Sequence, residues 1–144
     1  MMSLLEEFMI EILAMLMGGR QMPARQVFRS IVSQSARIRV MKVLLEEAPH
    51  NRDKAAEHDE VITRFERISE ARNRYVHGMW YTRFGAIYIE ERRTPEDFTA
   101  RKKREVKLSE LETLTHEMAD LARLITKIVY PPKTKSAPSN RNAS

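Results

Sequence analysis

The sequence is poor in the residues that several classes of protein need. It has no cysteine, which excludes disulfides, thiolate nucleophiles and cysteine-based metal sites and favours a reducing cytoplasm over secretion. Its four glycines and six prolines are too few for an all-β fold. Neither GxxxxGK nor GxGxxG occurs, so phosphate loops of these kinds are excluded. The histidines are scattered and no HExxH motif occurs, so we expect no metal site and no cofactor.

Long apolar runs are also absent. No run approaches the ~20 residues of a membrane-spanning helix. Near the N-terminus, Glu6, Glu7 and Glu11 interrupt the apolar residues, and no basic residue precedes them, which is unlike a secretory signal. We therefore expect a cytoplasmic protein that does not enter a membrane.

The chain nevertheless contains enough apolar residues for one core. Of its 144 residues, 42% are hydrophobic and 31% are charged, and 25 basic residues against 20 acidic ones give a net charge of +5. A chain of this length corresponds to one domain. We assign residues 1–130 to a helical domain, and the polar, proline-containing residues 131–144 to a disordered tail.

Apolar residues recur at helical spacing in four segments. We expect helices over residues 3–17, 23–48 and 54–77, and a fourth that begins with a capping box at Ser109–Glu112. The third helix carries one stripe of inward-facing positions, and the fourth carries a seam of apolar residues spaced by three and four. The stripe consists of Val61, Phe65, Ile68, Arg72 and Tyr75 or Val76, and the seam of Leu111, Leu114, Met118, Leu121, Ile125 and Ile128.

The segment between the third and fourth helices has a different composition. Residues 79–90 are aromatic and β-branched around Gly85, which predicts a short β-hairpin turning near that glycine. Residues 91–105 are charged and predict a loop, so that hairpin and basic loop together occupy about residues 79–107. The predicted fold class is all-α, an up-down four-helix bundle with a short β-hairpin insertion between helices 3 and 4.

The residues best suited to chemistry lie at the end of the third helix. Arg72 occupies a position where the stripe predicts an apolar residue, Asn73 follows it, and His77 precedes Gly78. Arg72 and His77 lie about 140° apart around a regular helix, so another helix or a second subunit would have to complete a shared site. A purely structural interpretation remains open, in which Arg72 pairs with a carboxylate and His77 interacts with the helix dipole.

Arg72-Asn73, three residues, then His77-Gly78 resembles the RNxxxHG form of the HEPN signature. The helical layout of residues 3–130 is similar to that of HEPN domains, which are up-down helical bundles. The resemblance implies a homodimer that brings two motifs together across a groove. It also implies a metal-independent endoribonuclease, a non-catalytic RNA-, nucleotide- or protein-binding module, or a member of a toxin–antitoxin pair with an antitoxin partner.

The residue types suit RNA cleavage without a metal. Histidine transfers protons near neutral pH, and arginine offers a fixed fork of donors to phosphate oxygens. We therefore expect Arg72 to bind phosphate, His77 to transfer protons and Asn73 to orient the imidazole or donate to phosphate.

A basic run and several aromatic residues follow the motif. The run Arg101, Lys102, Lys103 and Arg104 could bind RNA phosphates or simply form a solvated loop. The aromatic residues could stack on bases or pack against the helices. They are Trp80, Tyr81, Phe84 and Tyr88.

Overall fold

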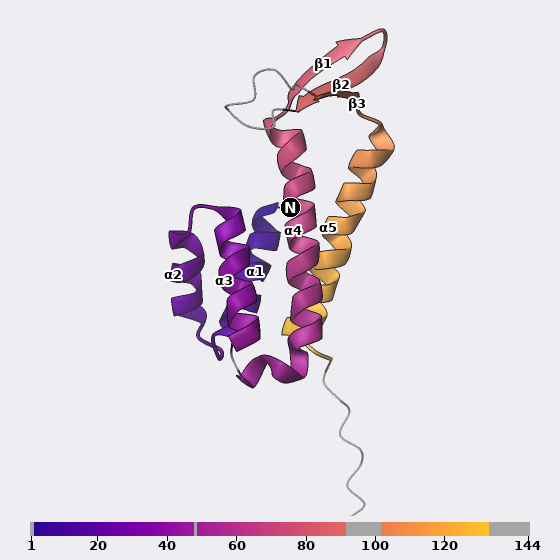
Figure 1. Ribbon diagram of the computed structural model, residues 1–144. Helices are drawn as coiled ribbons and strands as arrows, with labels where there is room; N and C mark the ends of the chain where they lie inside the picture. Colours follow the sequence, from indigo (N-terminus) through magenta and orange to yellow (C-terminus); the bar gives the residue numbers. More distant parts are fainter. Residues whose placement is uncertain (1, 48, 92–101, 133–144) are drawn as a thin grey trace, which may run out of the picture.

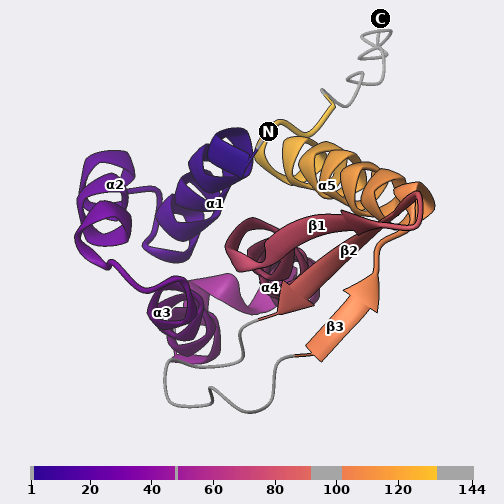
Figure 2. The same ribbon diagram turned by 90° about the horizontal axis from the view of Figure 1, so that it is seen from above.

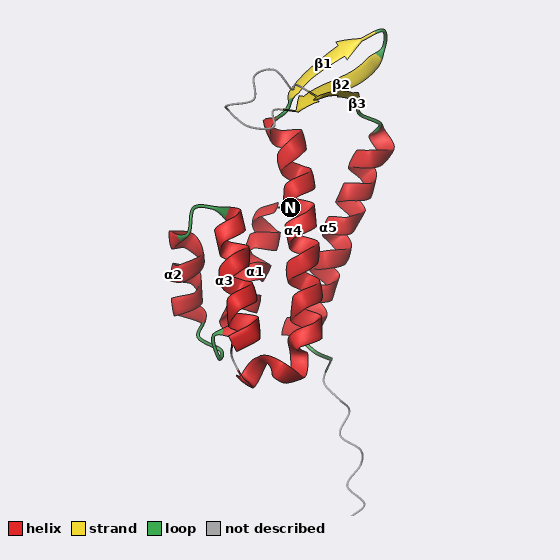
Figure 3. Ribbon diagram, in the orientation of Figure 1, coloured by secondary structure: helices red, strands yellow, loops and turns green. Residues whose placement is uncertain are grey.

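The structure is a computed structural model that describes residues 2–47, 49–91 and 102–132. It is mostly helical, with a small antiparallel sheet at one end (Figures 1 and 3). The elements in chain order are α1 (Met2–Leu16), α2 (Gln21–Ser30), α3 (Gln34–Glu47), the 3₁₀ helix η1 (Pro49–Lys54), α4 (Ala55–His77), β1 (Met79–Arg83), β2 (Ala86–Glu91), β3 (Lys102–Glu105) and α5 (Leu108–Val129).

The predicted second helix is wrong as a single element, because the chain forms α2 and α3 there with a break between them. Ile31 is extended, with φ −88° and ψ 111°. The Ser33 hydroxyl accepts a hydrogen bond from the backbone N–H of Ala36 at 3.4 Å, and the Arg37 Nε donates to the carbonyl of Ile31 at 2.7 Å. Side chains here satisfy backbone groups that a continuous helix would use, so the helix stops and starts again.

The remaining helix predictions are confirmed with small shifts in their ends. α1, α4 and α5 correspond to the predicted helices 3–17, 54–77 and the one from Ser109. After α1, Gly18 and Gly19 have φ of 74° and 84°, a conformation that glycine adopts without strain and that ends the helix.

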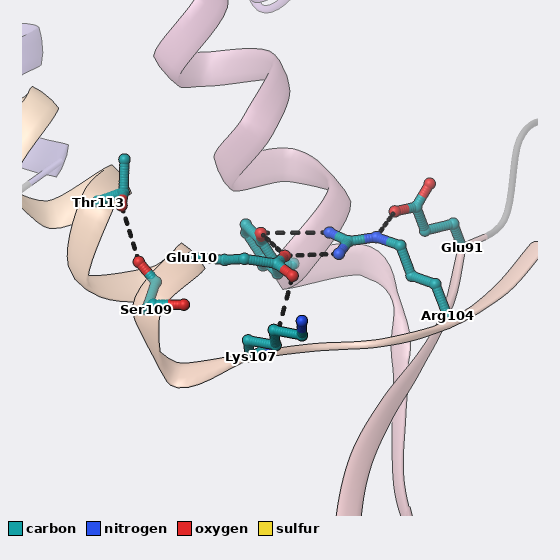
Figure 4. Close-up of polar contacts among 7 residues, drawn as sticks. Glu91, Arg104, Lys107, Ser109, Glu110 and Thr113 are labelled. Atoms are coloured by element: carbon teal, nitrogen blue, oxygen red, sulfur yellow. Dashed lines mark hydrogen bonds and ion pairs between the residues drawn. The ribbon is translucent and has the colours of Figure 1, made fainter.

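α5 begins one residue earlier than predicted, and its cap differs from the expected one. The Glu110 carboxylate accepts a hydrogen bond from the backbone N–H of Lys107 at 3.4 Å (Figure 4). The capping box expected at Ser109–Glu112 is therefore replaced by a contact between Lys107 and Glu110. The leucine at position 108 lies inside the first turn although its side chain is exposed.

The apolar core lies between α1, α3, α4 and α5, and α2 adds the buried side chains of Ala24 and Phe28. α1 contacts α2, α3 and α5, and α4 contacts α3 and α5. α2 lies against α1, where Arg25 forms an ion pair with Glu7 at 2.7 Å. The largest fully buried side chains come from α1, α3, α4, α5 and β2, and they are Leu5, Met9, Ile10, Ile12, Leu13, Leu16, Met41, Ile62, Phe65, Ile68, Ile89 and Leu121.

The predicted hairpin is confirmed, and it forms part of a larger sheet than expected. β1 and β2 pair in antiparallel register, with Tyr81 opposite Tyr88. β3 pairs with the other edge of β2, placing Arg104 opposite Ile89. Residues 102–105 were predicted as loop, so that prediction is corrected. Figure 2 shows the sheet lying across the end of α4.

The predicted tail and the predicted basic loop are described only in part. Residues 133–144 of the tail and residues 92–101 of the loop lie outside the described residues. Within the described part, no helix is both long enough and apolar enough to span a membrane.

Candidate functional site

The motif residues occupy the last turns of α4, which extend beyond the ends of α2 and α3 and lead into the sheet (Figure 1). The buried side chains of α4 all lie at or before Ser69. The predicted inward stripe is therefore confirmed at Val61, Phe65 and Ile68 but does not continue to Arg72, which is only half-buried. Arg72 thus needs no buried counter-charge, because it is not in the core.

Asn73 and His77 are exposed and lie four residues apart on one side of the helix. The Arg72 guanidinium donates to the Asn73 side-chain oxygen at 3.5 Å, the long limit of a hydrogen bond. Among the described residues, no carboxylate pairs with Arg72 and no side chain bonds the His77 ring. The helix remains regular through His77, so one chain brings Arg72 and Asn73 together but leaves His77 about 140° away from Arg72.

A polar groove of about 260 Å³ adjoins the motif on the side of Asn73. It lies between α4 and the start of α3, and the Gln34 side chain donates to the Ser69 hydroxyl across it at 3.4 Å. Residues at the break between α2 and α3 line this groove, among them Ser33 and Gln34. Because the sequence predicts one continuous helix there, it gives no indication of the groove. The lining residues are Ser33, Gln34, Ser35, Ile38, Glu66, Ser69, Glu70 and Asn73.

Gly78 ends α4 because the sheet approaches the helix closely at this point. Its backbone is extended, with φ −77° and ψ 154°, so the conformation alone does not require glycine. A Cβ atom here would lie 2.4 Å from the Ile89 side chain and 2.9 Å from the carbonyl of Arg74. Ile89 is fully buried. The glycine of the motif therefore allows β2 to pack against the helix end that carries His77.

A network around Arg104 fixes the sheet to α4 and α5 (Figure 4). The Arg104 guanidinium donates to Glu91 at 3.0 Å, to Glu110 at 2.5 Å and to the Tyr75 hydroxyl at 3.2 Å. The Tyr75 hydroxyl in turn donates to Glu110 at 3.1 Å. One side chain of β3 therefore joins β2, α4 and α5.

The charges of this network reinforce one another. The hydrogen bond from Arg104 lowers the pKa of Glu110 below its usual range, and the backbone N–H of Lys107 and the Tyr75 hydroxyl lower it further. The bonds to Glu110, Tyr75 and Glu91 raise the pKa of Arg104. Sequence reasoning missed Tyr75, Glu91 and Glu110 because they belong to three elements whose proximity no local pattern indicates.

The residues of the basic run 101–104, which we considered as an RNA-binding segment, have different environments. Arg101 lies outside the described residues, and Lys102 begins β3. Lys103 is exposed on β3. All three guanidinium nitrogens of Arg104 are bonded within the protein, which gives this residue a structural role.

The aromatic residues of the hairpin also have different environments. The indole N–H of Trp80 donates to the carbonyl of Tyr75 at 2.7 Å, so this residue braces the end of α4. Tyr81 and Tyr88 stack across the strands, with ring centroids 5.5 Å apart. Phe84 lies at the hairpin turn and is 92% exposed.

In the described ranges, no three His, Asp or Glu side chains gather as metal ligands would. The candidate site therefore consists of Arg72, Asn73 and His77, the polar groove beside Asn73 and the sheet that follows α4.

Comparisons of the chain with protein-family models, with curated proteins and with solved structures found no match.

Proposed function

We propose that this protein is a HEPN-like, metal-independent endoribonuclease that acts as a homodimer in the cytoplasm. The observation that carries the proposal is the accessibility of the motif at the projecting end of α4. Asn73 and His77 are exposed, Arg72 is half-buried, and no carboxylate of the described residues occupies its guanidinium. A purely structural Arg72 would be paired with a carboxylate, whereas the place of His77 in the last turn of α4 also fits an interaction with the helix dipole.

The helical arrangement supports the same proposal. In this interpretation, α1, α3, α4 and α5 are the helices of an up-down four-helix bundle and α2 is an additional helix against α1. The motif ends α4, the long helix that directly precedes the sheet. The toxin or defence role, with an antitoxin as a possible partner, belongs to the proposal on the resemblance alone.

The proposal requires a second copy of the chain. Arg72 and His77 diverge around α4, so one chain does not direct both side chains at one phosphate. Two copies meeting at this end of α4 would supply two imidazoles and two guanidinium groups. One imidazole would then act as the base and the other as the acid.

The chemistry follows from these roles. One neutral His77 removes the proton of the ribose 2′-hydroxyl, and the resulting oxygen attacks the adjacent phosphorus. Arg72 stabilises the added negative charge, while Asn73 orients the imidazole or donates to a phosphate oxygen. The second His77, protonated, gives its proton to the 5′-oxygen as the P–O5′ bond breaks. The products are a 2′,3′-cyclic phosphate and a 5′-hydroxyl end.

Cleavage of labelled single-stranded RNA in EDTA tests this mechanism. We expect wild-type protein to yield 2′,3′-cyclic phosphate ends, and His77→Ala to be slower by at least about 100-fold, since a proton-transfer group contributes that much. His116→Ala, which changes an exposed histidine on α5, is the matched control and should cleave normally. Cleavage by His77→Ala at the wild-type rate, or loss of wild-type activity in EDTA, would overturn the proposal.

The groove beside Asn73 supports a second candidate, a non-catalytic module that binds RNA or a nucleotide. Its serine, glutamine and carboxylate side chains can bond a base or a ribose without reacting with it. In that case the protein would bind RNA in the same experiment and release no fragments, and Asn73→Ala would weaken binding.

A further inference from the structure

The face of the sheet turned away from the helices combines aromatic and basic side chains. Side chains alternate between the faces of a strand, and Ile89 of β2 is buried toward the helices. The opposite face therefore carries Tyr81 and Tyr88, which pair across the strands, and Lys103 and Glu105 of β3. We call this face, together with Arg83 and the turn residue Phe84, the outer sheet face.

Phe84 is placed where neither folding nor turn formation explains a phenylalanine. It is 92% exposed, so its ring adds no core stability. Its φ is 51°, a left-handed conformation that disfavours bulky side chains. Together with Gly85, at φ 76°, it forms a tight turn with positive φ at both central positions, for which Asn-Gly is the preferred sequence. A strained, exposed aromatic residue at this position indicates a contact with another molecule.

The aromatic rings are accompanied by positive charge and by a depression in the surface. The Arg83 guanidinium carbon lies 5.1 Å from the centre of the Phe84 ring. Lys103 and Arg83 are both exposed, and the acidic residues of the same face are Glu105 and the buried Glu90, which lies opposite Lys103 on β2. A groove of about 400 Å³ runs between these side chains, lined by Tyr81, Arg83, Phe84, Tyr88, Lys103, Arg104 and Glu105.

We propose that the outer sheet face binds single-stranded RNA. Unpaired bases stack on Phe84 and on the pair Tyr81–Tyr88, and Arg83 and Lys103 contact the phosphates. Aromatic rings interleaved with cations suit single strands because every base has a stacking face and every linkage a negative charge. This inference concerns a surface separate from the site on α4. It rests on the proposed function in one respect, the choice of RNA rather than DNA as the ligand.

Fluorescence anisotropy with a 12-nucleotide 2′-O-methyl oligouridine tests the proposal, since this probe lacks the hydroxyl needed for cleavage. The decisive variant is Phe84→Asn, which removes the ring and creates an Asn-Gly turn that the hairpin prefers, so the fold is retained. Val32→Asn is the matched control, because Val32 is 94% exposed on the segment between α2 and α3. We expect Phe84→Asn to weaken binding about 5- to 150-fold and Val32→Asn to leave it unchanged.

Two further measurements separate stacking from charge. Arg83→Gln should lower the slope of log affinity against log salt by about one phosphate contact. A fully paired duplex of the same length should bind at least about tenfold more weakly than the single strand, because its bases are not free to stack.

The outcomes distinguish this inference from the proposed function. RNA binding that depends on Phe84 without cleavage by wild-type protein supports the inference and counts against the nuclease. Wild-type cleavage together with unchanged binding by Phe84→Asn overturns the inference alone. Equal affinity for duplex and single strand also overturns the inference. So does a Phe84→Asn variant that binds RNA like wild type but no longer associates with itself, because Phe84 would then contact a second copy of the chain.

Discussion

The two halves of α4 have the same backbone conformation and opposite environments. In the N-terminal half, residues 58–69, the side chains that face the core between α4, α3 and α5 are buried, including Phe65 at 1% exposed. In the C-terminal half, residues 70–77, none is buried, and the helix is supported by polar contacts of Tyr75 with Arg104, Glu110 and Trp80.

This difference separates stability from function along one helix. The N-terminal half contributes apolar burial, which dominates the free energy of folding. The C-terminal half carries Arg72, Asn73 and His77 where a ligand can reach them. Because the C-terminal half relies on hydrogen bonds and ion pairs, we expect that it can be loosened without unfolding the core. The predictions that follow test this division, beginning with the largest expected effect.

Leu121→Asp should unfold the whole protein. Leu121 of α5 is fully buried in the core, and an unpaired carboxylate there should cost at least about 5 kcal/mol, comparable to the total stability of many domains. Circular dichroism should show loss of the cooperative thermal transition. Thr115→Asp, at an exposed position on the same helix, should melt like wild type. A cooperative transition at the wild-type temperature for Leu121→Asp would show that α5 packs in another register.

Arg104→Gln should release the sheet and the end of α4 while the core remains folded. The substitution removes bonds to two carboxylates and a hydroxyl, worth about 3 kcal/mol after allowance for their partial exposure. Hydrogen exchange should show loss of protection in β2 and β3 and little change in α1.

Lys103→Gln, the neighbouring exposed residue on β3, is the control for the sheet and should exchange like wild type. Equal loss of protection in α1 and in β2 would mean that the two regions unfold as one unit, and the division drawn along α4 would be wrong.

His58 should make the core sensitive to mild acid. Its ring is 3% exposed, and neither ring nitrogen has a hydrogen-bond partner among the described residues. Burial, and then the charge of Lys54, lower the pKa of His58 below its usual value of 6.5, against an opposing effect of Glu57. The unfolded chain therefore binds the proton more readily than the folded one, so stability should fall as the pH falls below about 6.5, by up to about 1.4 kcal/mol per pH unit.

His58→Leu should remove this dependence and raise stability by about 1–2 kcal/mol, because a side chain of similar size without unsatisfied nitrogens replaces the ring. Urea titrations between pH 5 and 7 measure both effects, in a range above that in which Glu110 takes up its proton. His116→Leu is the exposed control and should retain the wild-type pH dependence. A parallel pH dependence in His58→Leu would assign the acid sensitivity to another group.

Periodicity predicted the parts of the fold that depend on one helix face at a time. The positions Val61, Phe65 and Ile68, and likewise Leu121, Ile125 and Ile128, are buried as expected. The stripe failed at Arg72 because spacing describes a face of a helix and not how far the neighbouring helices extend along it.

Two elements escaped prediction for different reasons. The break at residues 31–33 depends on the Arg37 side chain reaching back to the carbonyl of Ile31. β3 has a charged sequence without strand periodicity, and it becomes a strand because β2 offers it an edge and because Glu91 and Glu110 neutralise Arg104. Of the candidate site, the sequence indicated only the local motif of Arg72, Asn73 and His77. The groove beside Asn73 and the network of Tyr75 could not be predicted, because they join segments that are distant in the chain.

The sequence by itself determined α1, α4 and α5, the hairpin turn and the presence of Arg72, Asn73 and His77 near one helix end, because these depend on local spacing and conformational preference. Only the tertiary structure decided that this end projects from the core, that β3 completes the sheet and that Arg104 fixes the sheet to α4 and α5. Those features arise from contacts between segments far apart in the chain, which no local pattern records.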